Sequence, residues 1–460
     1  MIALINPPFH QKSTYYFSYR RARYPNPSLA YIGGYLEKKD IPFRIIDAKF
    51  DDLSIQQIIK KLEHIKPRII GITSTTTEMN FVHSIISEIK NNFPKSLVVL
   101  GGVHATALPV ETLNANRDLD ALVAGEAEYV LEKLATADNE RKVLPDIRGI
   151  YFRKGEDVLH TSPQIFDGNL HGYGKAAFHL WDKAEKYFVF TYRGCPFPCS
   201  FCFRALGKKA RLRRPEDVLY ELEYIASNAP QSELSIVDAT FGLHRSHTVN
   251  ILEEMIRRRI NKRLRWSCST RVDIVNKDFL MLMKEAGCST VSFGLEAGSD
   301  RILKATGKNV TVARCVEAVK EAKSVGLETT GYFIFGHIGE TKEDVEETLG
   351  LIWKINCDKI AVGVMVPWPG TEVYELAKRN EGGYRLLSTD FSKYDKYFGN
   401  VIEFENFSMN YLDIMRIKAF LYLYLRNYRL GDLLKFLWSS RGQAVRKMSQ
   451  IIKHSLHDEK

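Results

Sequence analysis

The 460-residue sequence has no uninterrupted apolar run of about 18 residues, the length that a membrane-spanning helix requires. Its first residues, MIALINPPFH, lack the basic-then-apolar pattern of a signal peptide. Seven cysteines are an odd number, and three of them fall within eight residues, which is a poor disulfide framework and a good metal-site pattern. These absences predict a cytoplasmic protein in a reducing compartment, with weak membrane-surface association as a minor alternative.

The sequence also shows only a modest bias of charge. Lys and Arg number 65 and Asp and Glu number 55, so the formal net charge is 65 − 55 = +10. No single basic face is visible, and anionic ligands or solubility explain this excess as well as a nucleic acid does. We therefore expect no nucleic-acid partner. The chain is longer than one ordinary hydrophobic core, which predicts two or three domains.

Short apolar runs alternate with helical patterns over residues 1–138. The strand-like runs are residues 2–5, 43–47, 68–73, 97–101 and 121–124. The helical patterns are residues 28–38, 53–65, 81–91 and 126–135. This alternation predicts an α/β fold, a Rossmann-like doubly wound sheet that binds ligands at the carboxyl ends of its strands. Pro7 and Pro8 stand where a nicotinamide site would have a Gly-rich turn, so such a site is not expected.

Three further segments complete the chain. Residues 139–184 predict a linker with a small hairpin that turns at Gly155. Residues 185–400 resume the strand–helix alternation, which predicts a (β/α)6 partial TIM barrel. Its expected strands are residues 188–193, 234–238, 265–269, 290–295, 330–335 and 360–366. Residues 401–460 predict a helical, basic C-terminal extension that packs on the barrel.

The strongest signal is a cysteine-rich loop that follows the first predicted barrel strand. Its sequence is TYRGCPFPCSFC, and it contains Cys195, Cys199 and Cys202. Each thiolate can bind one iron of a [4Fe–4S] cluster, and because only three ligands are local, one iron is left open. Zinc is the alternative, but structural zinc commonly uses two CxxC pairs and no second pair follows. The other four cysteines are expected to be buried structural thiols.

The CxxxCxxC spacing, with an aromatic residue before the last cysteine, resembles the signature of the radical S-adenosylmethionine (SAM) enzymes. Residues 293–300, 333–341 and 367–371 resemble the fourth-, fifth- and sixth-strand segments of that family. Residues 1–135 resemble the cobalamin (B12)-binding domain that one branch carries upstream, with matching loops at 101–104 and 125–128. That branch includes class B methyltransferases and the anaerobic Mg-protoporphyrin monomethyl ester cyclases.

The resemblance implies three cofactors: a [4Fe–4S] cluster, SAM and cobalamin. A cluster reduced by a donor such as flavodoxin or ferredoxin would cleave SAM to a 5′-deoxyadenosyl radical, which abstracts hydrogen from a small-molecule substrate. The first hypothesis is methylation of an unactivated carbon or phosphorus, with cobalamin as methyl carrier. The second is a radical oxidative cyclisation or rearrangement, as in the porphyrin-ester cyclases. The third is a non-catalytic cobalamin or cluster sensor.

By the same resemblance, the SAM contacts fall on the cysteine loop and on loops after the barrel strands: Phe201, Asp238, Arg271, Glu296, Gly336, Val366 and Pro367. Three of these have structural alternatives. Glu296 could pair with Arg301 or Lys304. Arg271 could pair with Asp273, and Asp238 could cap a helix. Glu340 is expected to cap the helix that follows it.

The implied cobalamin contacts lie on three loops of the N-terminal domain: Thr73, Ser74, Thr75, Gly101, Gly102, His104, Gly125 and Glu126. Some cobalamin domains carry an Asp-x-His-x-x-Gly motif whose His binds cobalt from below. The matching residues 47–52 contain neither His nor Gly, so we predict no lower His ligand. His104 is expected to form a hydrogen bond within its loop. The alternative is a Rossmann-like domain that has lost its cofactor.

Overall fold

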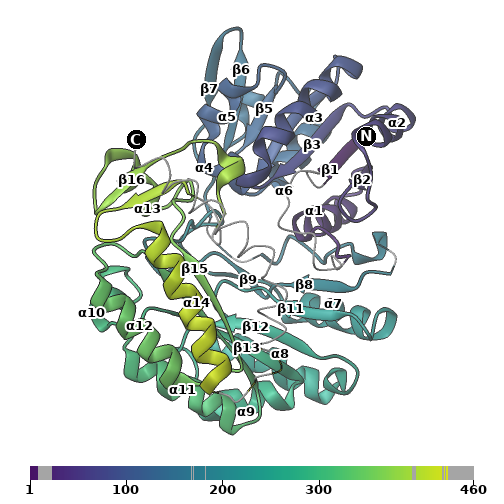
Figure 1. The fold of residues 1–460 in the computed structure, drawn as a ribbon. Helices are drawn as coiled ribbons and strands as arrows, with labels where there is room; N and C mark the ends of the chain where they lie inside the picture. The colour runs from purple at the N-terminus through teal and green to yellow at the C-terminus, as the bar shows by residue number, and fades with distance from the viewer. Residues whose placement is uncertain are drawn as a thin grey trace, which may run out of the picture.

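The computed structural model describes residues 1–8, 23–166, 168, 170–181, 183–395 and 400–426, together with residues 429, 431 and 433. Two sheets, one in each half of the chain, lie one above the other in Figure 1, with helices around them. The predicted C-terminal extension is described only in its first part. Residues 434–460 lie outside the described residues.

The N-terminal sheet has seven strands in the order β2-β1-β3-β4-β5-β6-β7. The strands are β1 (Ile2–Asn6), β2 (Phe43–Asp47), β3 (Ile69–Ser74), β4 (Leu97–Gly102), β5 (Ala121–Val123), β6 (Ile150–Lys154) and β7 (Asp157–His160). The first five are parallel, which confirms the predicted doubly wound fold. Because the strand order reverses beside β1, the carboxyl ends of β1, β3 and β4 open a crevice for a ligand.

Helices cover both faces of this sheet because successive strand residues point to opposite sides. They are α1 (Pro27–Lys38), α2 (Ile55–Ile65), α3 (Met79–Asn92), α4 (Val103–Ala107), α5 (Pro109–Ala115) and α6 (Glu128–Thr136). Ile5 and Leu100 belong to the core formed with α2 and α3. Leu4 and Val99 belong to the opposite core, which is formed with α1 and α6 and continues into the barrel. The two halves therefore share one hydrophobic core.

The predicted hairpin is formed by β6 and β7. Gly155 occupies the turn with φ of 63°, a left-handed conformation that glycine adopts without strain. Strand β6 pairs antiparallel with β5, with Ala121 opposite Phe152. The hairpin is thus an extension of the N-terminal sheet.

The second sheet has six parallel strands in the order β8-β11-β12-β13-β14-β15. The strands are β8 (Lys186–Val189), β11 (Glu233–Ile236), β12 (Trp266–Thr270), β13 (Cys288–Glu296), β14 (Glu328–Phe335) and β15 (Lys359–Val364). The outer helices are α7 (Pro215–Asn228), α8 (Arg245–Arg257), α9 (Lys277–Glu285), α10 (Asp300–Ala305), α11 (Val312–Ser324), α12 (Lys342–Ile355) and α13 (Glu372–Arg379). No pairing closes β15 onto β8 within the described residues, so the predicted partial barrel is confirmed.

The first barrel strand is shorter than predicted. Residues 188–193 do not form one strand, because β8 ends at Val189 and a separate strand β9 (Tyr192–Arg193) pairs antiparallel with β10 (Arg211–Leu212). The break occurs where the amide and hydroxyl of Thr191 both donate to the carboxylate of Asp238, each at 2.6 Å. The chain therefore leaves the sheet just before the cysteine loop.

The C-terminal part packs on the barrel. Strands β16 (Tyr384–Leu386) and β17 (Ile402–Phe404) form a hairpin, and the short helix η6 (Phe391–Lys393) lies between them. Helix α14 (Met409–Arg426) lies against α12 and β15, as Figure 1 shows. The helical cap is thus confirmed for this segment.

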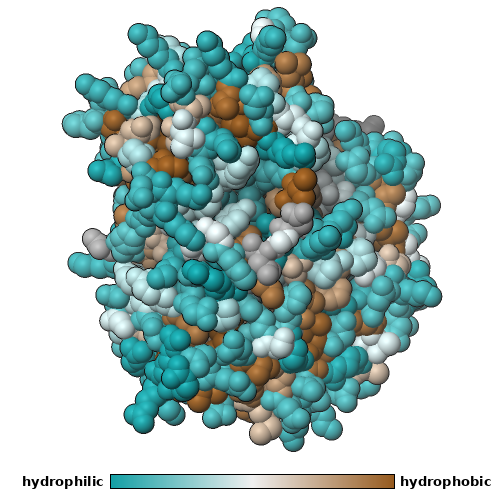
Figure 2. All heavy atoms as spheres, turned by 180° about the vertical axis from the view of Figure 1, so that it is seen from behind, coloured by the Kyte–Doolittle hydropathy of each residue, from teal (hydrophilic) through white to brown (hydrophobic). Residues whose placement is uncertain are grey.

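Figure 2 shows one face of the molecule, which is mostly hydrophilic and is hollowed between the two halves. Among the described helices, none combines the length and the apolar character that crossing a membrane requires.

Candidate cofactor sites at the domain interface

The cysteine loop between β9 and β10 is held by backbone hydrogen bonds on two sides. The amide of Cys195 donates to the carbonyl of Gly207 at 3.1 Å, and the amide of Ser200 donates to the carbonyl of Thr306 at 3.0 Å. Gly194 has φ of 92°, and a Cβ there would lie 2.0 Å from the carbonyl oxygen of Lys209. Only glycine fits this close approach. The loop is therefore fixed in place by its neighbours.

The three thiols of the loop differ from the remaining cysteines in exposure. Cys195 and Cys199 are half-buried and Cys202 is exposed. The other four are buried in the core, as expected for structural thiols: Cys268, Cys288, Cys315 and Cys357. Burial of its sulfur raises the pKa of Cys199, and the charges of Lys308 and Arg271 act in the opposite direction. Coordination to iron would deprotonate these thiols outright.

The geometry of the loop does not suit a single metal ion. Within the described part of the chain, no three His, Cys, Asp or Glu side chains are close enough together to hold one. A mononuclear zinc site with Zn–S bonds of about 2.3 Å would need its sulfurs within about 4 Å of one another. A cubane cluster uses one thiolate per iron and so accepts a wider triad. Three local thiolates match a cluster that keeps one iron open, whereas a structural zinc site needs a fourth ligand.

Glu296 ends β13 next to the cysteine loop. It is buried, and its φ of 64° places it in the left-handed region, which is uncommon for a residue other than glycine. Its carboxylate pairs with Lys308 Nζ at 2.7 Å. The partners expected from the sequence, Arg301 or Lys304, were wrong; Arg301 instead pairs with Asp344. A strained, paired carboxylate at a strand end is the kind of feature that clusters at functional sites.

Arg271 follows β12 and lies beside the same loop. Its Nε and Nη2 donate to the carboxylate of Asp273, both at 2.9 Å, as the structural alternative predicted. Nη2 also donates to the carbonyl of Lys308 at 2.6 Å, and the guanidinium lies 3.8 Å from the ring centroid of Phe197. Its Nη1 is buried and has no partner among the described residues. A buried donor without an acceptor is costly, so this group is available to an anionic ligand.

Asp238 does not cap a helix among the described residues, and it lines neither of the two pockets described below. It is buried and accepts the two hydrogen bonds from Thr191. Burial raises its pKa to about 6, although the hydrogen bonds from Thr191 oppose this shift. Asp238 thus fixes the chain direction four residues before Cys195.

A pocket of about 260 Å³ opens at the carboxyl end of β13, β14 and β15. Three of the residues expected as SAM contacts line it: Phe201, Glu296 and Val366. Pro367 lies between two lining residues, Val366 and Trp368. Gly336 is outside this lining.

Gly336 and Glu340 form a buried turn after β14. Glu340 accepts hydrogen bonds from the amides of Gly336 and His337, and Tyr384 donates to the carbonyl of Gly336 at 2.9 Å. Burial raises the pKa of Glu340 to about 8. The expected helix-capping role of Glu340 was wrong, because Thr341 caps α12 through its side chain.

A larger pocket of about 330 Å³ lies at the carboxyl ends of β1, β3, β4 and β5, and its lining is mainly apolar. Five predicted cobalamin contacts line it: Thr73, Gly101, Gly102, Gly125 and Glu126. Gly102 has φ of 105°, and a Cβ there would lie 2.4 Å from the carbonyl oxygen of Ser74. Phe190 and Leu206 of the barrel close the pocket from the other side. Such a broad apolar cradle fits the face of a corrin ring.

Three predicted contacts do not line this pocket. Ser74 donates to the carbonyl of Gly101 at 3.4 Å, and Thr75 donates to the carboxylate of Glu78. His104 is buried, and its Nδ1 lies 3.3 Å from the hydroxyl of Thr76. Thr76 belongs to the neighbouring loop after β3, so the expectation of a hydrogen bond within the loop of His104 was wrong. Burial, reinforced by the nearby His83, lowers the pKa of His104 to about 4.

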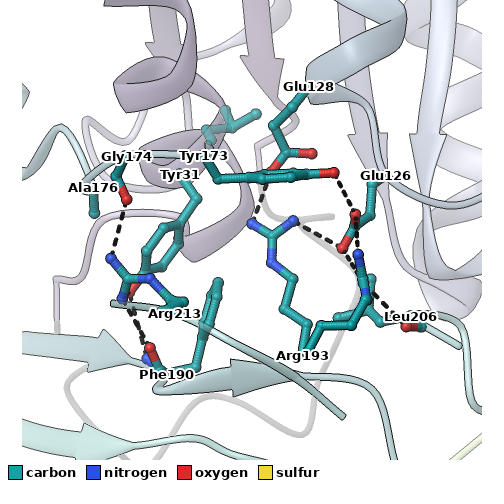
Figure 3. Close-up of polar contacts among 12 residues, drawn as sticks. Tyr31, Glu126, Glu128, Tyr173, Gly174, Ala176, Phe190, Arg193, Leu206 and Arg213 are labelled. Atoms are coloured by element: carbon teal, nitrogen blue, oxygen red, sulfur yellow. Dashed lines mark hydrogen bonds and ion pairs between the residues drawn. The ribbon is translucent and has the colours of Figure 1, made fainter. Parts of the chain in front are cut away.

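Charged residues join the two halves beside the larger pocket, as Figure 3 shows. Glu126 pairs with Arg193 and Arg211, and Arg193 also pairs with Glu128. Burial opposes ionisation of Glu126, but the hydrogen bonds from Arg211 and the charge of Arg193 outweigh it and lower the pKa of that carboxyl. Sequence reasoning missed both arginines. The one available signal was the position of Arg193, two residues before Cys195.

Family models match both halves of the chain. The Radical SAM superfamily matches residues 189–352, and the B12 binding domain matches residues 17–135. An uncharacterized methyltransferase of Pyrococcus horikoshii is 32% identical over 413 residues, which cover 87% of this chain and 88% of the relative. An anaerobic magnesium-protoporphyrin IX monomethyl ester cyclase of Cereibacter sphaeroides is 28% identical and covers 81% of this chain and 62% of the relative.

The fold also matches a solved structure. The radical SAM methyltransferase TsrM from Kitasatospora setae, with cobalamin and a [4Fe–4S] cluster bound, has a TM-score of 0.74 at 19% identity, covering 92% of this chain and 90% of that chain. The shared fold and the 32% identical relative indicate a family. The cysteine loop and the two pockets are consistent with the same family. The chain belongs to the radical SAM superfamily of enzymes, in the branch with an upstream B12-binding domain, and its cofactors are a [4Fe–4S] cluster, SAM and cobalamin.

Proposed function

We propose that this enzyme methylates an unactivated carbon, or a phosphorus, of a small-molecule or natural-product substrate. One observation carries the proposal. The apolar pocket of the N-terminal domain is closed by Leu206, which lies four residues after Cys202 on the barrel. The two proposed cofactor sites would therefore adjoin across the domain interface. A substrate between them would meet both a radical source and a methyl carrier.

Cys195, Cys199 and Cys202 would hold the cluster, and the loop that carries them is fixed by hydrogen bonds to Gly207 and Thr306. When bound, the three cofactors supply reductive cleavage of SAM and methyl transfer. The protein supplies orientation and a site from which water is excluded. Asp238 contributes by holding Thr191 at the start of the loop segment, and it makes no contact with a cofactor in this proposal.

SAM would occupy the pocket of about 260 Å³. The unpaired Nη1 of Arg271 would donate to its carboxylate, because a guanidinium binds carboxylates strongly. Glu296 would accept a hydrogen bond from its amino or ribose group while Lys308 holds the carboxylate in place. Phe201, Val366 and the adjoining Pro367 would pack on the adenine, and Gly336 would shape the loop below it.

Cobalamin would occupy the pocket of about 330 Å³, with Thr73, Gly101, Gly102 and Gly125 against the corrin. The loops that contact cobalamin would be held by hydrogen bonds of Ser74, Thr75 and His104, which do not line the pocket themselves. Glu126 would act through its ion pairs. We propose no His ligand below cobalt. Asp47 occupies the matching segment and accepts hydrogen bonds from Asn6 and Trp181.

The relatives support methyl transfer and one alternative. The 32% identical relative is called a methyltransferase. A cytidylyl-2-hydroxyethylphosphonate methyltransferase of Streptomyces wedmorensis is 26% identical over 392 residues. The cyclase relative favours a second candidate function, a radical oxidative ring closure. We further propose a small soluble redox protein, such as flavodoxin or ferredoxin, as the electron donor, and a cytoplasmic location.

The test is anaerobic turnover with SAM labelled in its methyl group. The protein is reconstituted with iron, sulfide and cobalamin, reduced, and incubated with candidate substrates. Methyl transfer predicts S-adenosylhomocysteine together with 5′-deoxyadenosine, and label in the product. Ring closure predicts 5′-deoxyadenosine alone and no label in the product, which would overturn the proposal.

A further inference from the structure

We infer that Glu126 is a positioning residue that fixes bound cobalamin relative to the cluster loop, acting through Arg193 and Arg211. The inference rests on the proposed function, because it concerns the distance between the two cofactors. Glu126 follows Gly125 at the carboxyl end of β5, and the two arginines belong to β9 and β10, the antiparallel pair of strands that flanks the cysteine loop.

Glu126 receives hydrogen bonds on both carboxylate oxygens. Arg211 donates from Nη2 and Nη1 to Oε1 and Oε2, at 2.7 and 3.0 Å. Arg193 Nη1 donates to Oε1 at 3.0 Å, and the hydroxyl of Tyr173 donates to Oε2 at 3.0 Å. A two-pronged guanidinium–carboxylate contact fixes direction as well as distance.

Arg193 extends this contact to a second acid. Its Nη2 lies 2.7 Å from Oε1 of Glu128, the first residue of α6. Figure 3 shows Arg193 reaching up from the barrel between Glu128 and Glu126. Two carboxylates and two guanidinium groups balance in charge, and each of these side chains is at most 8% exposed.

The network touches both cofactor sites. Glu126, Glu128 and Arg193 line the larger pocket. Arg193 is separated from Cys195 only by Gly194, and Arg211 is its partner in the pairing of β9 with β10. A shift of the pocket wall would therefore be passed to the cluster loop through buried side chains that are each held by more than one hydrogen bond or ion pair.

Buried ion pairs contribute little net stability, and in some proteins they instead specify one geometry; we infer that role here. An apolar interface of the same area would allow the N-terminal domain to slide on the barrel, because hydrophobic contact is non-directional. Radical transfer requires reacting atoms at closely defined positions. The charged network beside the pocket would hold the cobalamin site at a fixed position relative to the cluster loop, as such a reaction requires.

A second buried pair in the same interface provides a matched control. Arg213 and Glu221 are paired at 2.5 Å, and Tyr31 of α1 donates to Glu221 at 2.9 Å. Both members are at most 3% exposed, yet neither lines the larger pocket. The pair reaches the wall of the larger pocket only through Tyr31, which donates to Glu221, and the carbonyl of Phe190, which accepts from Arg213. Losing it removes a comparable buried charge contact at one residue's remove from the cobalamin site.

The test compares Glu126→Gln with Glu221→Gln in the full chain, reconstituted anaerobically with cluster and hydroxocobalamin. Pulsed paramagnetic resonance measures the distance distribution between cob(II)alamin and the reduced cluster, and an equilibrium titration measures cobalamin affinity. We expect Glu126→Gln to broaden or shift the distance distribution and to weaken cobalamin binding about tenfold. Glu221→Gln should leave the distribution as in the wild type. Arg211→Lys keeps the positive charge but loses the two-pronged contact with the carboxylate, so it should behave as Glu126→Gln does. It replaces Glu126→Gln in the test if Glu126→Gln does not fold.

An unchanged distribution and affinity in both Glu126→Gln and Arg211→Lys would overturn the inference while leaving the proposed function intact. An equal disturbance in Glu221→Gln would overturn it as well, because the effect would then be a general one of lost interface charge. A wild-type protein that binds no cobalamin would overturn the proposed function, and this inference with it.

Discussion

His104 and Phe391 meet across the domain interface, with ring centroids 4.7 Å apart at an interplanar angle of 70°. Phe391 begins η6, and the neighbouring Asp390 accepts a hydrogen bond from Asn80 at 2.9 Å. The hairpin after the barrel therefore packs against the loop that follows β3 and against α4. This contact holds His104 in the interface, bonded to Thr76 and away from the lining of the larger pocket.

A His104→Gln variant should bind cobalamin without a change in its spectrum. The physical reason is that His104 is committed to Thr76 and Phe391, so cobalt has no nitrogen ligand from this side chain. The check is the paramagnetic resonance spectrum of cob(II)alamin, in which a His ligand adds nitrogen hyperfine splitting. Such splitting in the wild type that vanishes in His104→Gln would contradict the assignment.

Gly101 and Gly102 should respond differently to substitution. Gly102→Ala forces a Cβ against the carbonyl of Ser74 and a left-handed φ, and such strain typically costs about 1–3 kcal/mol. It should lower the melting temperature of the apoprotein. Gly101 lines the larger pocket and has open space around its Cβ position, so Gly101→Leu should fold normally and exclude cobalamin. The two measurements are apoprotein melting and cobalamin titration. If Gly101→Leu still bound cobalamin, the larger pocket would not be the cobalamin site.

Glu296→Gln should weaken SAM binding by about tenfold, equivalent to about 1.4 kcal/mol. The substitution removes a charge that pairs with Lys308 and that would accept a hydrogen bond from SAM. The readout is the shift that SAM produces in the resonance spectrum of the reduced cluster. Glu328→Gln is the control, because Glu328 pairs with Lys359 at 2.8 Å at the opposite, amino end of β14. Equal SAM affinity in the two variants would argue against a role for Glu296.

Glu340 should make the protein less stable as the pH rises. Its folded-state pKa of about 8 lies above the ordinary value of 4.5, so between these values the native state binds a proton that the unfolded state releases. The free energy of unfolding therefore falls with pH in this window, by up to about 1.4 kcal/mol per pH unit. Glu340→Gln should remove this contribution and melt higher than the wild type at pH 8, with a smaller difference at pH 5. Parallel melting curves of the two apoproteins across that range would contradict it.

Local patterns were sufficient to predict much of this architecture. Alternating apolar runs located both parallel sheets, and Gly155 marked the hairpin turn. The spacing of Cys195, Cys199 and Cys202 located the cluster loop, because ligands close in sequence need no long-range information. The break of the first barrel strand at Thr191 was missed, since it depends on Asp238, 47 residues away.

Contacts between distant segments could not be predicted from the same patterns. The pairing of Glu126 with Arg211 spans 85 residues, and the contact of His104 with Phe391 joins the two halves of the chain. Lys308 was not expected as the partner of Glu296, because proximity in sequence favoured Arg301 and Lys304. Periodicity records which face of an element is buried, and it does not record which element covers that face.

The central claim is that Cys195, Cys199 and Cys202 hold a [4Fe–4S] cluster with one open iron. Its most direct test is Mössbauer and paramagnetic resonance spectroscopy of the anaerobically reconstituted protein, with Cys315→Ala as the control for a buried thiol. We predict one cluster per chain, a spectrum that shifts on addition of SAM, and loss of both in Cys199→Ala but not in Cys315→Ala. Stoichiometric zinc in place of iron, or a fully loaded protein without a cubane cluster, would contradict the account.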